Sequence, residues 1–209
     1  MFPASVQAWA RGCAEAIVSP LVRWHVTANT ITVVGFLLNV LTAIVIASNH
    51  LSTGGVLLLF SAAFDLLDGA IARVTNSQSR FGAFLDSVLD RYSESVILLG
   101  LLYVETRLRH VGTVILVYAV AVGSIMISYA RARAEGLGLD AKVGIAPRPE
   151  RVLILGAGLV FPGPITGKTT VVALWILAII THVTAMQRLM HVWRQTQYVD
   201  GDAQGRSAP

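Results

Sequence analysis

Apolar residues recur along the chain in six long runs separated by short polar stretches. The runs cover residues 31–48, 54–73, 82–104, 111–133, 150–166 and 169–190. Each run approaches the ~20 residues that an α-helix needs to cross the hydrocarbon core of a bilayer. The fifth is the shortest and is rich in Gly and Pro. The pattern predicts an all-α integral membrane protein with six transmembrane helices.

The N-terminal region has a different pattern, in which small apolar residues alternate with Arg11 and Glu15 over residues 3–20. With Trp9 and Trp24 at headgroup depth, this pattern predicts a juxtamembrane amphipathic helix. An ordinary helix packed on the domain would give the same pattern. We therefore expect a juxtamembrane amphipathic helix at 1–24, a six-helix domain at 25–195 and a polar cytoplasmic tail at 196–209.

Composition supports the membrane assignment, since the chain is 55% hydrophobic and only 13% charged. The net charge of +4 would suggest nucleic acid as the partner of a soluble protein. Here the basic residues adjoin apolar runs, so orientation in the bilayer and contact with anionic lipid or phosphate explain them better, and no nucleic acid is expected. Cys13 is the only cysteine, which rules out an internal disulfide.

The distribution of basic residues predicts the orientation in the membrane. An even number of spans puts both termini on one side. The opposite side holds only Arg107, Arg109 and Lys168, and the other thirteen of the sixteen Lys and Arg residues share the side of the termini. By the positive-inside rule, we expect a multi-pass protein of the cell membrane with both termini in the cytoplasm.

Four carboxylates stand out because they lie inside or at the edges of two apolar runs: Asp65, Asp68, Asp86 and Asp90. An unpaired ionisable group in a membrane helix costs about 3 kcal/mol or more, so it indicates a functional site. The pairs are spaced i, i+3 and i, i+4, which puts each pair on one helix face. The second run heads toward the cytoplasm and the third away from it, so all four lie at a similar depth, near the cytoplasmic surface.

A cluster of carboxylates without Cys or His suits a hard cation with oxygen ligands, Mg²⁺ or Mn²⁺, better than zinc. Two divalent ions would balance the four negative charges. Gly69 follows Asp68 and Ala72 lies one turn further on, so both leave room for a ligand to approach the helix.

These residues resemble the signature of the CDP-alcohol phosphotransferases at every fixed position. The matching pattern is Asp65-x2-Asp68-Gly69-x2-Ala72-Arg73-x8-Gly82-x3-Asp86-x3-Asp90. The resemblance implies six transmembrane helices, a homodimer, a two-metal site, and transfer of a phosphatidyl or similar group from a CDP-linked lipid to an alcohol, with release of CMP. It also implies that the four aspartates bind the metals and that Asp90 acts as general base. The positions that it places at the CDP moiety are Asp65, Asp68, Gly69, Ala72, Arg73 and Gly82.

Upstream of the first run, residues 26–32 resemble the family's Thr-Pro-Asn-x-Ile-Thr sequence, with Ala28 where proline is usual. Asn29 and Thr32 are then candidates for contacts with the CDP moiety. A helix cap formed by these residues is the alternative interpretation.

A group of polar residues at the ends of the last three runs bears on the acceptor alcohol. It comprises Ser128, Arg131, Arg148, Arg151 and Arg188. By the predicted topology these side chains lie at the depth of the carboxylates, where arginines would hold a phosphate through bidentate hydrogen bonds. We therefore expect a phosphorylated alcohol as acceptor. Arg133 and Arg194 are interpreted as ordinary basic residues of the cytoplasmic side.

The motifs Ser-Tyr-x-x-Ala-Arg-Ala-Glu, Arg-Pro-Glu-Arg and Gln-Arg-Leu resemble those of the phosphatidylinositol-phosphate synthases of actinobacteria. Arg131 stands where those enzymes have lysine, and Ala146-Pro147 where they have Ile-Glu. The resemblance implies CDP-diacylglycerol as donor and inositol 1-phosphate as acceptor. Phosphatidylglycerol-phosphate synthase, or another member of the CDP-alcohol family, is the alternative enzyme.

A membrane transporter is the non-enzymatic alternative, because transporters also carry intramembrane acids. Transporters show internal repeats and interrupted helices. The sequence has no repeat, and a carboxylate cluster confined to one side of the bilayer forms no path across it. Release of CMP from CDP-diacylglycerol would distinguish the enzyme from a transporter.

Overall fold

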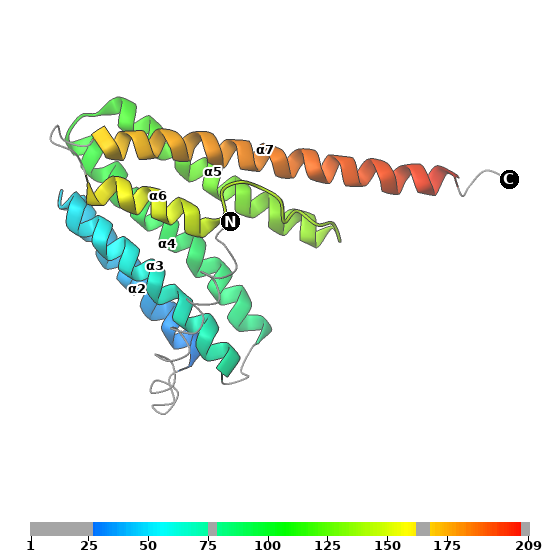
Figure 1. Ribbon diagram of the computed structural model, residues 1–209, viewed down its shortest axis with the longest axis horizontal. Coiled ribbons are helices and arrows are strands. Elements are labelled where there is room, and N and C mark those ends of the chain that lie inside the picture. The colour runs from blue at the N-terminus through cyan, green and yellow to red at the C-terminus, as the bar shows by residue number, and fades with distance from the viewer. Residues whose placement is uncertain (1–26, 75–78, 162–167, 206–209) are drawn as a thin grey trace.

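The computed structural model describes residues 27–74, 79–161 and 168–205, with side chains described for 27–65, 79–161 and 168–197. Within these ranges the chain is entirely helical and has no strand, which confirms the all-α prediction. The helices are α2 Ala28–Ala47, α3 Leu51–Val74, α4 Arg80–Arg107, α5 Val111–Gly136, α6 Arg148–Val160 and α7 Lys168–Gly205 (Figure 1). Each predicted apolar run overlaps one of these helices. The predicted N-terminal amphipathic helix lies outside the described residues.

In the part of the chain that the structure describes, three stretches are long and apolar enough to cross a membrane: Ala28–Ala47, Val111–Gly136 and Lys168–Gln197. A shorter apolar stretch, Leu51–Asp65, begins α3. Large apolar side chains such as Leu37, Ile44 and Tyr118 are more than half exposed on the outside of the bundle. Their exposure would be unfavourable in water and is expected in contact with lipid, so the chain is a membrane protein.

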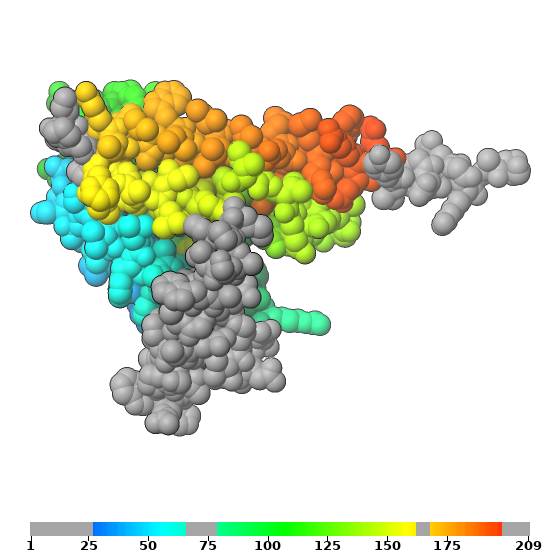
Figure 2. Space-filling view, in the orientation of Figure 1, coloured from blue at the N-terminus to red at the C-terminus, as the bar shows by residue number. Residues whose placement is uncertain are grey.

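The order of helices in space differs from their order along the chain. Helix α2 packs against both α3 and α4, whereas α3 and α4 have no close backbone contact within the described residues. Helix α3 packs on α6, α4 on α5, and α7 covers both α5 and α6. Figure 2 shows α6, in yellow, at the surface between cyan α3 and orange α7. The carboxylate-bearing helices α3 and α4 are therefore held apart by α2 and approached by α6.

The apolar core lies at the end of the bundle away from the carboxylates. Ile46, Leu101, Leu159 and Leu174, from α2, α4, α6 and α7, are almost completely buried there. At Gly100 the helices α2 and α4 approach so closely that a Cβ would lie 2.5 Å from the carbonyl oxygen of Ala43. Small residues at such crossings are typical of membrane helices, which gain stability from close packing.

Two helix ends differ from the predicted runs. The fifth run was expected to reach residue 166, but α6 ends at Val160. Phe161 has φ −114° and ψ 71°, because the residue before a proline is disfavoured in the helical region. The sixth run was expected to end at 190, but α7 continues to Gly205 and has 38 residues, a length of about 57 Å. It extends well past the rest of the bundle (Figure 1).

The connection between α5 and α6, residues 137–147, lies along the polar part of α7, and we call it the strap. The side chain of Gln195 accepts a hydrogen bond from the backbone N–H of Asp140 at 3.2 Å and donates one to its carbonyl at 2.8 Å. Arg188 donates from Nε to the carbonyl of Val143 at 2.9 Å. Gly144 has φ +132°, and a Cβ there would collide with Thr184. These contacts favour the helical continuation of α7 and position the start of α6.

Candidate active site

Two of the predicted acids meet at the first residue of α6. Asp65 lies in the second half of α3, Asp90 lies in α4, and Arg148 opens α6. The guanidinium of Arg148 bridges them, with Nη2 3.1 Å from Asp65 Oδ2 and Nη1 2.7 Å from Asp90 Oδ1. The three side chains are 22%, 27% and 27% exposed. The site is therefore partly buried yet open to a ligand.

The other two predicted acids extend this cluster along the same helices. Asp86 precedes Asp90 by one turn of α4, and Asp86 and Asp65 both lie within electrostatic range of Asp90. Asp68 lies one turn after Asp65 in α3, but its side chain is outside the described part. The same holds for the side chains of Ala72 and Arg73 and for the surroundings of Gly69. The structure thus brings Asp65, Asp86 and Asp90 into one region, as expected.

The donor chemistry of this region fits a hard divalent cation, because every acidic group contributes carboxylate oxygens. Among the side chains that the structure describes, no three acids converge on one point. Instead, Arg148 lies between Asp65 and Asp90. Asp65 also packs directly on α2, where a Cβ at Gly35 would lie 2.7 Å from its Oδ1. The glycine therefore lets the carboxylate lie against the α2 backbone.

Three of the residues predicted to contact the CDP moiety, Asn29, Thr32 and Gly82, lie where α2 and α4 begin. A Cβ at Gly82 would be 3.0 Å from Asn29 Oδ1, so the two helix starts touch. The interpretation of Asn29 and Thr32 as a helix cap is wrong, since Thr27 is the N-cap and accepts a hydrogen bond from the backbone of Thr30 at 3.2 Å. Asn29 and Thr32 lie inside the first turns of α2. Ala28 is the first helical residue, a position that also tolerates proline.

The predicted phosphate-binding residues come from the second half of α5, the first turn of α6 and the middle of α7. Arg188, on α7, is 9% exposed and donates from Nη1 to the carbonyl of Ile127, next to Ser128, at 2.6 Å. It lies within electrostatic range of Arg91, Arg131 and Arg151. Arg131 is exposed and pairs with Glu135 at 2.9 Å. Arg148 differs from the rest of the group, because it is paired with the acids.

Glu94 is the acidic residue of this region that the sequence interpretation missed. It accepts hydrogen bonds from Nε and Nη2 of Arg151 at 2.9 and 2.7 Å, and from the hydroxyl of Ser124 at 2.9 Å. Its spacing of four residues from Asp90 places it on the same face of α4, and that spacing was the available signal.

Comparison with known proteins identifies the family. The family described as CDP-alcohol phosphatidyltransferase matches residues 25–199. The archaetidylinositol phosphate synthase of Methanothermobacter thermautotrophicus is 39% identical over 168 residues, 80% of this chain and 84% of that protein. The phosphatidylinositol phosphate synthase of Mycobacteroides abscessus is 36% identical over 181 residues, 85% of this chain and 82% of that protein.

Two solved structures of Mycobacterium tuberculosis phosphatidylinositol phosphate synthase are similar to this one. The form with CDP-DAG bound has a TM-score of 0.80 at 34% identity, covering 86% of this chain and 93% of that chain. The complex with manganese and citrate also has a TM-score of 0.80 at 34% identity, covering 86% and 88%. Each match therefore covers most of both chains.

Proposed function

The chain belongs to the CDP-alcohol phosphatidyltransferase family, and on this premise we propose that it transfers the phosphatidyl group of CDP-diacylglycerol to a hydroxyl of inositol phosphate. The products are phosphatidylinositol phosphate and CMP. One observation supports this acceptor most strongly: the relatives are named for different lipids, archaetidyl and phosphatidyl, but all for inositol phosphate. The acceptor is the feature that these similar proteins share.

The carboxylates are proposed to bind metal and to take up the proton. Asp65, Asp68, Asp86 and Asp90 would hold two divalent cations, Mg²⁺ or Mn²⁺, which neutralise the diphosphate and the leaving group when bound. Asp90 accepts the proton of the attacking hydroxyl. The hydroxyl oxygen forms a bond to the β-phosphorus as the bond from phosphorus to the oxygen of CMP breaks, and CMP leaves with that electron pair. Asn29, Thr32 and Gly82 are proposed to line the nucleotide side, with Gly69, Ala72 and Arg73.

The acceptor phosphate is proposed to bind among Ser128, Arg131, Arg148 and Arg188. The charge distribution supports this pocket, because Arg188 lies within electrostatic range of Arg131, Arg151 and Arg91, with Glu135 as the opposing charge. Like charges at short range repel each other, and a bound phosphate would offset that repulsion. Arg148 would link this pocket to the carboxylates, since it already contacts Asp65 and Asp90. Arg151 is considered separately below.

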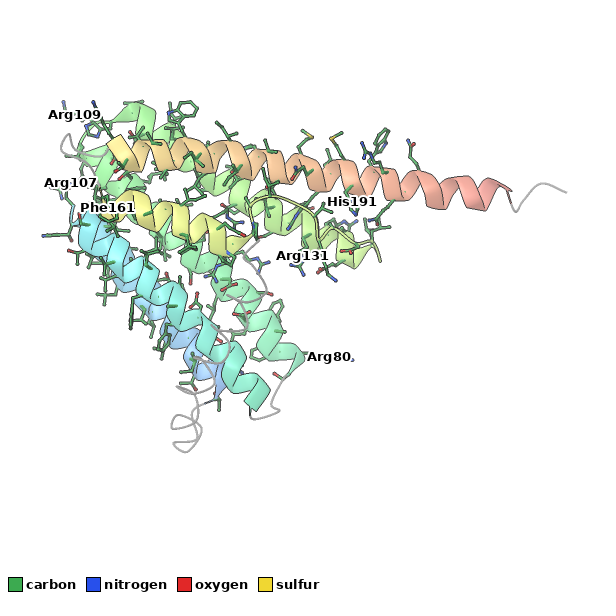
Figure 3. The ribbon with its side chains drawn as sticks, viewed as in Figure 1. Arg80, Arg107, Arg109, Arg131, Phe161 and His191 are labelled. Atoms are coloured by element: carbon green, nitrogen blue, oxygen red, sulfur yellow. The ribbon has the colours of Figure 1, made fainter. Side chains whose placement is uncertain are left out.

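The arrangement in the membrane is also a proposal. Six spans with both termini and the site in the cytoplasm agree with the position of Arg107 and Arg109 beside Phe161 at one end of the bundle, away from Arg131 (Figure 3). We further propose a homodimer in the cell membrane, a juxtamembrane amphipathic helix at 1–24, a six-helix domain at 25–195 and a polar cytoplasmic tail at 196–209. The start of that tail continues α7.

The test is CMP release by the purified protein with Mg²⁺. CDP-diacylglycerol and CDP-archaeol serve as donors, and inositol 1-phosphate, inositol, glycerol 3-phosphate and serine as acceptors. Release with CDP-diacylglycerol and inositol 1-phosphate alone is expected. Release only with glycerol 3-phosphate would make the protein a phosphatidylglycerol-phosphate synthase. Absence of release with every pair would contradict the enzymatic proposal and favour the transporter alternative.

A further inference from the structure

The ion pair between Glu94 and Arg151 lies deeper than the cluster around Arg148. Arg151 is only 4% exposed, and the Glu94 side chain 16%. Arg151 directs Nε and Nη2 to the Glu94 carboxylate and Nη1 to the carbonyl of Ala146 at 2.8 Å. Ser124, 3% exposed, adds a hydrogen bond from α5. A buried charge pair with these additional bonds is fixed in one geometry.

Two ion pairs connect α4 with α6, one helical turn apart. We call Asp90–Arg148 the outer pair and Glu94–Arg151 the inner pair. Asp90 and Glu94 are one turn apart on α4, and Arg148 and Arg151 are one turn apart on α6. Within the described residues, α4 and α6 have no close backbone packing of their own. The α6 start is therefore joined to α4 through these two ion pairs, in addition to its packing on α3 and α7. The outer pair is open to a ligand, whereas the inner pair is buried.

We propose that Glu94 is a positioning residue, which holds Arg151 and the first turn of α6 so that Arg148 reaches the carboxylates and the acceptor phosphate. This inference rests on the proposed function and deepens it. Arg151 then acts on the acceptor through the placement of Arg148, and its guanidinium remains bound to Glu94 throughout the reaction. Loss of the Glu94 charge would release Arg151 and displace Arg148. Binding of the acceptor would then weaken more than binding of the donor.

The experiment compares Glu94→Gln with wild type in CMP release, varying the acceptor and CDP-diacylglycerol separately. We expect the KM for the acceptor to rise about tenfold or more and the KM for CDP-diacylglycerol to change less than about threefold. The matched control is Glu105→Gln. Glu105 is a buried acid at the far end of α4, paired with His110 at 2.8 Å, and its loss should leave both KM values unchanged.

Double variants distinguish a positioning role of Arg151 from direct contact between Arg151 and the acceptor. The exchange Glu94→Arg with Arg151→Glu keeps the ion pair and should return the acceptor KM to within about threefold of wild type. The apolar pair Glu94→Leu with Arg151→Met is the second variant, in case the exchange does not fold. If a folded double variant fails to restore the KM, Arg151 touches the acceptor and the proposal is wrong. A lowered Tm with an unchanged acceptor KM in Glu94→Gln would also overturn it.

The same assay distinguishes failure of the proposed function from failure of the proposed role of Glu94. Wild-type CMP release with each acceptor tests the reaction and its substrate. The KM comparison then uses whichever acceptor the wild type accepts. A different acceptor would correct the function and leave the test of Glu94 intact.

Discussion

The two ends of the helical bundle are held together by different forces. At the carboxylate end, charged side chains connect helices whose backbones stay apart, as Arg148 connects Asp65 with Asp90. At the opposite end, the backbones touch, as at Gly100 and Ala43, and the side chains between them are apolar. The partly exposed ion pairs of Arg148 can exchange partners when a ligand arrives, whereas close backbone packing cannot. The comparison indicates a rigid end that supports an adaptable one.

The largest effect is expected for Asp90→Asn at the adaptable end. Replacing the carboxylate with an amide removes the proposed base, so CMP release should fall about 10³-fold, within the range for general bases. CDP-diacylglycerol binding, measured by titration calorimetry, should persist, because the other acids remain. Full activity in this variant would remove Asp90 from the role of base.

At the rigid end, Gly100→Ala should lower the free energy of unfolding by about 2 kcal/mol. The new methyl group would meet backbone atoms of Ala43, so α2 and α4 must separate. Thermal unfolding in detergent measures the change. Gly112→Ala is the matched control, since a Cβ there has nothing within 4 Å, and it should be neutral or stabilising. Equal effects in the two variants would contradict close packing as the cause.

Arg148→Lys tests whether the adaptable end needs the bidentate guanidinium of Arg148 or only a positive charge at this position. An ammonium group cannot donate to both carboxylates in the geometry of a guanidinium, so we expect the acceptor KM to rise about tenfold. Arg107→Lys, at the other end of the bundle, is the control and should behave as wild type. An unchanged KM in Arg148→Lys would show that charge alone is sufficient.

The smallest effect is expected at the margin of the proposed pocket. Arg131→Gln should raise the acceptor KM about threefold without changing Tm, because the exposed ion pair with Glu135 contributes at most about 1 kcal/mol. Arg133, two residues along α5, faces another direction, and Arg133→Gln should have no effect. Equal KM values for the two variants would place Arg131 outside the pocket.

The helices and the acids could be predicted from the sequence because both signals are local. Apolar runs of bilayer length gave the six helices, and the i, i+3 and i, i+4 spacings put the acids on shared faces. The partners of those acids could not be predicted. Glu94 and Arg151 are 57 residues apart, and their contact depends on how α6 is placed by α3 and α7.

The ends of two helices were mispredicted for different reasons. Hydropathy indicates only the part of a helix that is apolar enough to lie in lipid. It therefore does not predict the polar continuation of a helix such as α7. The polar end of α7 is stabilised instead by the strap, through Arg188 and Gln195. At α6, the effect of a proline on the preceding residue shortened the helix to Val160.

The length of α7 has a practical consequence for imaging. A protein of 22.4 kDa is small for single-particle electron microscopy and offers few features for alignment. Helix α7 projects beyond the bundle as an unbroken rod (Figure 1). A helical fusion partner joined to it in register would continue this rod in a fixed direction relative to the bundle, and would serve as a rigid marker for image alignment.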